Sequence, residues 1–593
     1  MRGAVGCSSV PWWGRLSSMT TTAARQESSP TGHRRAALLV LALITVVGAV
    51  VRATGLGSAG LFYDDAWFAL PSRVGIGTAM KMVVTTPGYT LLQDAWISAG
   101  PSGNAWPKVL PFLLGVLAAP AGYWLSRRYE MPRWVALCVA GLLAAAPAAI
   151  EYSVRVKEYE ADLLLGVAVL GVAELVRRRR SGTSLASLAV VSLLAVLMSS
   201  SLLVVVGGSW AALIAIAFGD RRWLRSVLAF GVATAAACGL ETMWISSHIP
   251  ASLTEFWIAT HRLVGAPFSS SGLAHTIALT FAGLLHGLVG TPLPTGPFPM
   301  TLVISDAAET LWIASGALAL VLFVVLVWPV VRSVGGRRDG DPALALLAPS
   351  LTMILALVAW VGGAVPLGTG RSDLALYPAI AVLLGAGLLR LSGRLAKIGI
   401  APATRRSATV ALACAAGLAT TGLAWHQRSW YPAQDLAVLH RAMVARGVLH
   451  PGDVSVVEGR NTYGWAFEGL SPFVVHIDRN DPRGRTVGFW VTFPSDRVLA
   501  VESSTPTGAI KGQRAIPGLD QLPPSAHRLW VFGTTNSSYS PSAYRIRGPR
   551  GRLMMPMGID PLLSKHGWTA QHGWTPRSGR VHAPGVVAVL YTR

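Results

Sequence analysis

The sequence predicts a polytopic α-helical membrane protein with a small C-terminal α/β domain outside the membrane, and three observations predict this fold class. Hydrophobic residues make up 52% of the 593-residue chain and charged residues only 13%, and the mean hydropathy is +0.49. One water-soluble core cannot bury so many apolar side chains, so several apolar runs are expected to lie in lipid. Arginines flank these runs, and from residue 426 onwards the composition turns rich in Gly, Pro and Ser.

Eleven apolar runs are candidates for transmembrane helices, because a span needs about 20 apolar residues and fewer where protein shields it. They cover residues 36–52, 109–126, 133–150, 160–176, 185–200, 202–218, 227–246, 309–331, 343–365, 374–390 and 408–425. The membrane domain is therefore predicted over residues 36–425.

The arginines predict the orientation in the cytoplasmic (inner) membrane. Arg34 and Arg35 precede the first run, so the polar residues 1–35, predicted to be disordered, are expected in the cytoplasm. With eleven spans, every loop expected on the cytoplasmic side is basic, as the positive-inside rule requires. This pattern explains the net charge of +22 without a nucleic-acid partner, since no basic patch interleaved with aromatic residues is present.

Residues 273–289 are also apolar, but His275 and His286 interrupt them. A span here would move the basic Arg332–Arg338 loop to the outer side, so we interpret this run as an interfacial or re-entrant helix. Two long outer loops are expected, over residues 54–107 and 247–308. The first holds apolar and aromatic stretches, which predict short helices lying at the membrane interface.

Residues 426–593 are predicted to form an extracytoplasmic α/β domain, because a helical stretch is followed by several short β-like runs. The helix is expected over Asp435–Arg446, and the strands over Val454–Glu458, Phe473–Ile477, Gly488–Phe493, Arg528–Phe532 and Val586–Tyr591. The four cysteines of the chain show no metal-ligand spacing and are expected to be inert.

Ionisable residues next to lipid are costly and are candidates for function. A first cluster, Asp64 and Asp65, follows the first predicted span. Two carboxylates at this place could supply a general base or hold a cation. The structural alternative is a helix start with an acidic first turn.

A second cluster lies between the third and fourth predicted spans, over Glu151–Asp162. If this segment is helical, its three- and four-residue spacings put part of it on one face. That face would carry Arg155, Glu158, Tyr159 and Asp162. The structural alternative is a solvated turn with local ion pairs, but a short turn between apolar helices needs few charges.

A third cluster, Gly368–Asp373, precedes the tenth predicted span. Its Arg371 is suited to bind a phosphate group, because a guanidinium donates paired hydrogen bonds to phosphate oxygens. The structural alternative is an interfacial anchor.

Together, the three clusters resemble motifs of GT-C class membrane glycosyltransferases, in the branch of the protein O-mannosyltransferases and aminoarabinose transferases. Relatives carry an Asp-Glu pair after the first span, a Val-Lys-Gln-Tyr-x-x-Asp-like segment after the third, and an Arg with Tyr-Pro near a late span. The matching residues here are Asp64, Asp65, Val156, Lys157, Tyr159, Asp162, Arg371, Tyr377 and Pro378. The resemblance covers roughly residues 36–460 and includes Gly452-Asp453-Val454 after the membrane domain. Asp65 replaces the usual Glu, and Glu158 replaces a common Gln.

The resemblance implies an inverting transfer of a sugar from a polyprenyl-phosphate carrier to an acceptor hydroxyl on the outer face of the membrane. It implies that Asp64, assisted by Asp65, accepts the hydroxyl proton. It implies donor phosphate binding by a set of cations, namely Lys157, Arg155 and Arg371. It assigns the orientation of sugar or acceptor to Tyr159, Asp162, Glu158 and Asp373.

Alternative functions stay open on the sequence alone. A transporter or flippase of a lipid-linked sugar would need charges paired across helices inside the spans. The ionisable candidates gather instead at the outer helix ends, and Glu174 and Glu241 are the exceptions. An inactive family member could serve as a binding or assembly module. The acceptor could be a glycan, a glycolipid or a protein, and the Arg- and Ala-rich chain of actinobacterial type fits mannose or arabinose carriers in cell-wall biogenesis. No cofactor is certain, and a divalent metal is left open.

Overall fold

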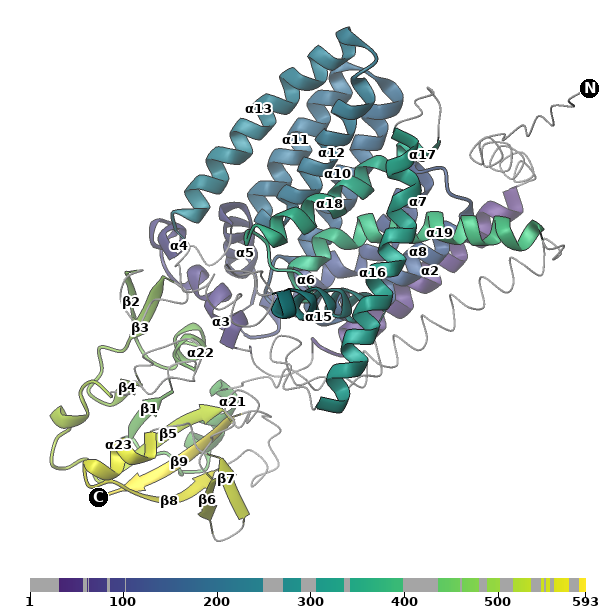
Figure 1. Cartoon of the computed structure of the whole chain (residues 1–593). Helices are drawn as coiled ribbons and strands as arrows, with labels where there is room; N and C mark the ends of the chain where they lie inside the picture. Colours follow the sequence, from purple (N-terminus) through teal and green to yellow (C-terminus); the bar gives the residue numbers. More distant parts are fainter. Residues whose placement is uncertain are drawn as a thin grey trace, which may run out of the picture.

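The protein folds into a helical bundle with a small sheet domain at one end, as the computed structural model in Figure 1 shows. The structure describes residues 31–56, 61, 63–82, 86–101, 103–248, 270–289, 306–334, 342–397, 436–458, 461–478, 488–501, 516–534, 545–548, 551–554, 559–574 and 586–593. The N-terminal residues 1–30 and the run 408–425 lie outside the described residues.

The helical part alternates long helices with short ones. Before the second cluster it contains α2 (Thr31–Ala53), α3 (Tyr63–Ala69), η1 (Leu70–Arg73), α4 (Ile76–Met82), α5 (Pro87–Ser98), α6 (Trp106–Val116), α7 (Ala118–Arg128), α8 (Arg133–Ala145) and α9 (Pro147–Tyr152). After it come α10 (Tyr159–Arg179), α11 (Gly182–Met198), η2 (Ser200–Leu202), α12 (Leu203–Ala217), α13 (Arg221–Ser246), α15 (Ser270–Val289), α16 (Asp306–Val334), α17 (Pro342–Ala345), α18 (Leu347–Val361), η3 (Ser372–Leu376) and α19 (Tyr377–Lys397).

Ten of the eleven predicted apolar runs coincide with these helices, all except 408–425. Among the described residues, five stretches are long and apolar enough to cross a membrane, namely Arg34–Ala53, Trp106–Arg128, Ser200–Ala217, Arg221–Ser246 and Ser372–Leu395. The multi-pass helical prediction is therefore confirmed. The short helices expected within residues 54–107 are present, as α3, η1, α4 and α5.

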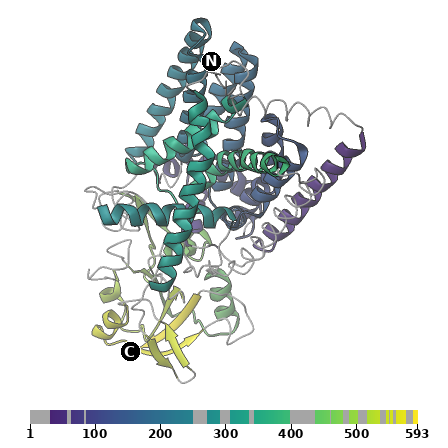
Figure 2. The same cartoon turned by 45° about the vertical axis from the view of Figure 1, so that its right-hand side comes forward.

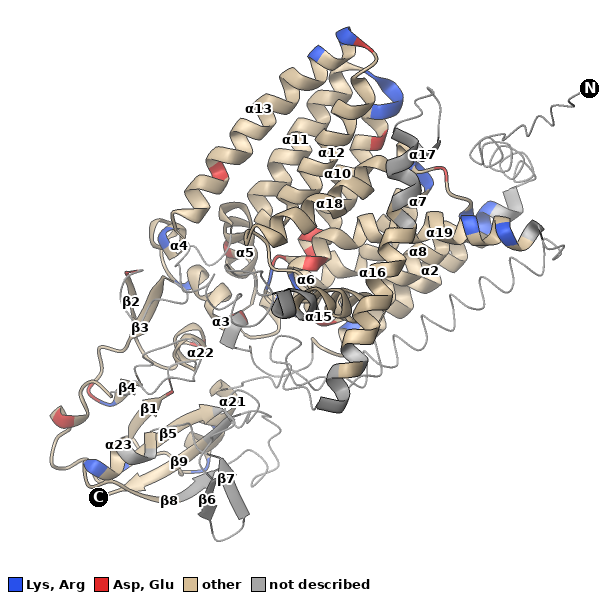
Figure 3. Cartoon of the chain, viewed as in Figure 1, with Lys and Arg blue, Asp and Glu red and all other residues tan. Residues whose placement is uncertain are grey.

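The charged residues are distributed unevenly along the bundle. Figure 3 shows that the basic ends of α7, α10 and α19 and the basic start of α13 lie away from the sheet domain. Figure 1 shows α15 nearly end-on while α11, α12 and α13 run lengthwise, so α15 lies across these helices. This direction agrees with the interpretation of residues 273–289 as an interfacial helix.

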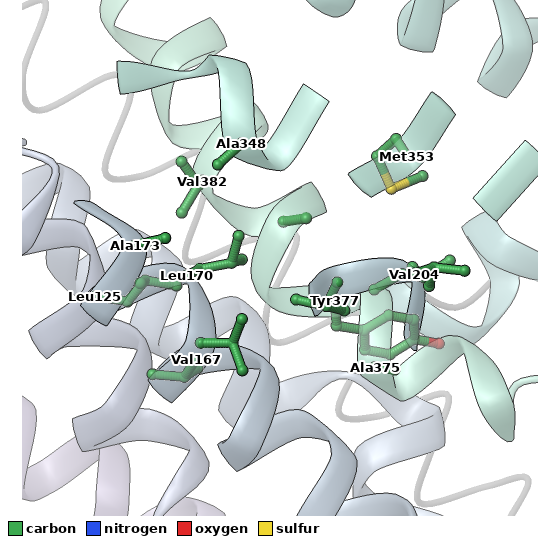
Figure 4. Close-up of a cluster of buried hydrophobic side chains, with 14 of the residues drawn as sticks. Leu125, Val167, Leu170, Ala173, Val204, Ala348, Met353, Ala375, Tyr377 and Val382 are labelled. Atoms are coloured by element: carbon green, nitrogen blue, oxygen red, sulfur yellow. The ribbon is translucent and has the colours of Figure 1, made fainter. Parts of the chain in front are cut away.

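Helix α10 lies at the centre of the bundle, because apolar residues occupy most of its circumference. It packs against α7, α11, α12 and α19. Figure 4 shows Val167, Leu170 and Ala173 of α10 among side chains from the other helices, and all three are buried. Its last turn contains three arginines, and positive charge at a helix C-terminus is stabilised by the helix dipole. Two of these arginines pair with Glu174 at 2.7 Å.

The C-terminal domain is built on a mixed five-stranded sheet in the order β4-β1-β5-β9-β8. Strand β1 is parallel to β4 and β5, while β9 runs antiparallel to β5 and β8. The strands are β1 (Val454–Val457), β2 (Val474–Ile477), β3 (Phe489–Thr492), β4 (Val498–Ala500), β5 (Arg528–Thr534), β6 (Arg545–Gly548), β7 (Gly551–Met554), β8 (Thr569–Trp574) and β9 (Val586–Thr592). The helices are α21 (Leu436–Ala445), α22 (Thr462–Phe467), η5 (Leu519–Gln521) and α23 (Ile559–Lys565).

All five predicted strands and the predicted helix are present, as β1, β2, β3, β5, β9 and α21. Asp453, directly before β1, forms side-chain contacts with two residues of β5. Its carboxylate pairs with Arg528 at 2.9 Å and accepts a hydrogen bond from Trp530 Nε1 at 2.9 Å. The prediction missed the short strand β4, the hairpin β6–β7, strand β8 and the helices α22 and α23.

The sheet domain and the short helices of residues 63–98 share one apolar core. Phe68, Leu70 and Val156 from the membrane part lie in the same buried cluster as Trp465 and Phe532 from the sheet domain. Helix α22 makes its main contact with α3, and Figure 1 shows α22 beside α3 at the end of the bundle. The C-terminal domain therefore rests directly on the helix that carries Asp64 and Asp65.

Candidate functional site

The first and second clusters are joined by a buried ion pair. Nε of Arg155 lies 3.1 Å from Oδ2 of Asp65, and the backbone N–H of Val156 donates to Oδ1 of Asp65 at 3.2 Å. Asp65 is 1% exposed and Arg155 is 6% exposed. Glu151 adds a weaker contact, with 3.8 Å between its carboxylate and the Arg155 guanidinium. Burial of both charges is tolerated because each is paired and hydrogen-bonded.

Lys157 lies on the aromatic side chains of α3. Its Nζ is 3.4 Å from the centre of the Phe68 ring and 5.4 Å from that of Trp67. Its backbone carbonyl accepts a hydrogen bond from the Tyr89 hydroxyl at 2.6 Å. Attraction between an ammonium group and an aromatic ring grows as water is excluded, so α3 and α5 together fix this lysine.

The third cluster joins the same place through Tyr152. Nε of Arg371 donates to the Tyr152 hydroxyl at 3.1 Å, and the Tyr152 ring meets the Tyr159 ring edge-on at 4.9 Å. Asp373 is buried and accepts backbone hydrogen bonds from Gly368 at 3.0 Å and from Gly370 at 2.6 Å. The Asp373 carboxylate thus holds the loop that presents Arg371.

The expectation of a single helical face over the second cluster is wrong. Helix α9 ends at Tyr152 and α10 begins at Tyr159, with turns and bends between them. The N–H of Lys157 bonds to the carbonyl of Arg155 at 2.8 Å, a spacing too short for a helix. Asp65 accepts the N–H of Val156 instead, so contact with α3 replaces a helical turn.

Carboxylates of the second cluster gather around Tyr89. Burial raises the pKa of Tyr89 well above its usual value, and the negative charges of Glu158, Asp162 and Asp65 raise it further. Tyr89 therefore acts as a neutral hydrogen-bond donor. Asp162 is completely buried near the start of α10, while Glu158 and Tyr159 are half-buried.

Several buried polar residues at the site were missed by the sequence analysis. Arg52 is 1% exposed and donates to the carbonyl of Ala144 at 2.7 Å, at the end of α8. Glu160 is fully buried, and neither of its carboxylate oxygens has a hydrogen-bond partner among the described residues. Tyr377, which the sequence analysis named only as a motif match, is also fully buried. Arg52 could have been recognised from the sequence, because it is a charge at the end of an apolar run. Tyr89 is uncharged and could not have been recognised in this way.

Asp64, the expected base, belongs to α3, but its side chain lies outside the described ones. Among the residues that the structure describes, no group of three or more His, Cys, Asp or Glu side chains could hold a metal ion. Carboxylate and imidazole groups are the usual ligands of divalent cations in proteins. A divalent metal at this site therefore stays a prediction that the described residues do not test.

No family model matches the sequence, and no curated protein matches it. Among solved structures, the chain is similar to ArnT from Cupriavidus metallidurans, with 14% identity and a TM-score of 0.48 over 88% of this chain and 98% of that one. It is also similar to the oligosaccharyltransferase of Archaeoglobus fulgidus, with 15% identity and a TM-score of 0.40 over 73% of this chain and 63% of that one.

A third similar structure is the arabinofuranosyltransferase AftD from Mycobacteria, with 16% identity and a TM-score of 0.39 over 93% of this chain and 39% of that one. This chain thus spans less than two thirds of the length of the oligosaccharyltransferase and of AftD.

Proposed function

We propose that this protein is an inverting GT-C glycosyltransferase that moves a sugar from a polyprenyl-phosphate carrier to an acceptor hydroxyl on the outer face of the cytoplasmic membrane. One observation carries the proposal: three charged clusters far apart in the sequence meet at the end of the bundle under the C-terminal domain. Asp65 contacts Arg155, and Arg371 contacts Tyr152. The basic helix ends lie away from this domain, which supports an extracytoplasmic site.

The reaction needs a base on the acceptor side. The acceptor oxygen forms a bond to the anomeric carbon, its proton passes to a carboxylate, and the bond from that carbon to the phosphate oxygen breaks. The carboxylate of Asp65 already accepts bonds from Arg155 and Val156. We therefore assign the proton to Asp64 and a positioning role to Asp65.

The leaving polyprenyl phosphate gains negative charge, which fixed cations stabilise in a site that excludes water. Lys157 and Arg371 are the residues assigned to this charge, with Arg155 contributing while it holds Asp65. Tyr159, Glu158 and Asp162 are assigned to the orientation of sugar or acceptor. Asp373 orders the Arg371 loop through its two backbone hydrogen bonds.

Support for a lipid-phosphate donor comes from two neighbours by name. ArnT from Cupriavidus metallidurans binds undecaprenyl phosphate, and the Archaeoglobus fulgidus oligosaccharyltransferase AglB has been solved with a dolichol-phosphate. Mannose-type and arabinose-type carriers are the two donor classes to compare. The acceptor class is a glycan, a glycolipid or a protein.

The test measures release of polyprenyl phosphate from a carrier labelled in its lipid, using membranes that contain the full chain. We expect release with one of the two donor classes, and loss of release in Asp64→Asn. Asp520→Asn is the matched control, because Asp520 is an exposed acid of the sheet domain and release should persist. Movement of intact carrier across the membrane that survives Asp64→Asn would instead favour a flippase.

A further inference from the structure

We infer that the C-terminal domain positions the reaction site, with Tyr463 of α22 acting as a positioning residue for Lys157 through Trp67 of α3. The inference rests on the proposed function for its kinetic consequences. The structural link itself consists of a chain of packed aromatic rings that ends at the lysine.

The first part of the link joins the two domains. The Tyr463 ring meets the Trp67 ring edge-on, with 6.2 Å between ring centres. Two contacts flank this pair: the Arg73 guanidinium lies 4.7 Å from the centre of the Phe467 ring, and the Asn104 amide donates to Glu468 at 2.7 Å. Edge-on aromatic pairs contribute about 0.5–1.5 kcal/mol beyond the area they bury.

The second part anchors Tyr463 within the sheet domain. Its hydroxyl donates to the carbonyl of Phe489 at 3.2 Å, and its ring meets the Phe489 ring at 5.5 Å. Phe489 begins β3 and is fully buried. The position of α22 is therefore set by the strand behind it rather than by contact with the membrane domain alone.

The third part lies on the other side of α3. Lys157 contacts Phe68 and Trp67, and Asp65 of the same helix accepts bonds from Arg155 and Val156. Residues 155–157 do not belong to a helix, because α9 ends at Tyr152 and α10 begins only at Tyr159. A displacement of α3 away from α22 would consequently move the cation that faces the donor phosphate.

The first experiment uses hydrogen exchange on the full chain in detergent, because it does not depend on activity. In Tyr463→Leu we expect amide exchange of residues 63–73 to rise by about 5-fold or more. Tyr463→Phe keeps the ring and should stay within about 2-fold of the unmodified protein. Leu522→Ala, which loosens the separate apolar cluster of the same domain, is the control and should leave residues 63–73 unchanged. Equal exchange in Tyr463→Leu and the unmodified protein would overturn the inference.

The second experiment is a double-mutant cycle on turnover. We expect Tyr463→Leu to lower kcat by about 10-fold with little change in KM for the donor, because Lys157 stabilises charge that develops in the transition state. In a Lys157→Met background the same change should matter by less than about 2-fold. Effects that multiply would show that Tyr463 does not act through Lys157. If the unmodified protein releases no polyprenyl phosphate, the proposed function fails, while the exchange experiment still decides the positioning role.

Discussion

At the scale of single residues, the site depends on how buried charges are paired. Asp65 and Arg155 are each almost inaccessible to water, and their ion pair of 3.1 Å replaces the hydration that both lose. Removing one partner of such a pair leaves a buried charge uncompensated, whereas removing both does not. The pair therefore stabilises the junction of α3 with residues 155–157 only while it is complete.

Asp65→Asn should destabilise the folded protein by about 3 kcal/mol, because the buried Arg155 guanidinium loses the carboxylate charge that lies 3.1 Å away. The double variant Asp65→Asn/Arg155→Met should be less destabilised than the single one. Thermal unfolding of the full chain in detergent checks this order. A double variant whose loss equals or exceeds the sum of the two single losses would contradict the prediction.

At the scale of elements, the Arg371 loop is held between α19 and the crossing helix α15. Gly368 and Gly370 have φ values of +72° and +68°, a region that glycine enters without steric cost. A Cβ on Gly368 would lie 2.5 Å from the Thr280 carbonyl of α15. A Cβ on Gly283 would in turn lie 2.2 Å from the Gly368 carbonyl, so glycines on both sides permit the close approach.

Gly368→Ala should cost about 1–3 kcal/mol of stability, because the added methyl group combines a strained backbone with a clash against Thr280. Displacement of the loop should also lower the transfer rate through Arg371. Gly239→Ala is the matched control, since a Cβ there meets nothing within 4 Å, and alanine should be neutral or slightly stabilising in a helix. Unfolding midpoints and rates of polyprenyl phosphate release check both. Similar midpoints for the two variants would refute this account of the loop.

At the scale of the whole molecule, we expect the stability of the sheet domain to depend on pH where it joins the bundle, through the half-buried His440. His440 of α21 packs edge-on against Trp465 at 5.3 Å, within the apolar region that also receives α3. Burial lowers the pKa of His440, and the neighbouring charge of Arg441 lowers it further. The folded state thus prefers neutral histidine, while the unfolded chain is protonated near the ordinary pKa of about 6.5.

The stabilisation from neutral His440 should be complete above about pH 6.5 and should be lost as the pH falls through that value toward the lower folded pKa. His440→Gln should remove this dependence, and His566→Gln, at a half-exposed position after α23 of the same domain, should retain it. Amide exchange of β5 across pH 5–7.5, corrected for the intrinsic rate, is the measurement. A pH dependence that persists in His440→Gln would exclude this histidine as its source.

Local patterns in the sequence predicted the elements, because burial in lipid and in a half-covered sheet each imposes its own residue periodicity. Ten of the eleven apolar runs coincide with helices, and the five β-like runs of residues 454–591 coincide with strands. The three charged clusters were equally visible, since a charge beside an apolar run is costly without a role. Each of these features can be predicted from residues that are close together in the sequence.

Long-range packing decided the rest. Residues 153–158 leave the helical path because Asp65, some 90 positions earlier, accepts the N–H of Val156, and no local spacing records that bond. Tyr89 and Tyr463 became part of the site only through contacts with distant segments, and the bond from Arg371 to Tyr152 joined the third cluster to the second. Sequence by itself therefore determined which segments form helices, strands and charged ends, whereas tertiary structure decided which charges neutralise one another, because pairing depends on distances that only the packed chain defines.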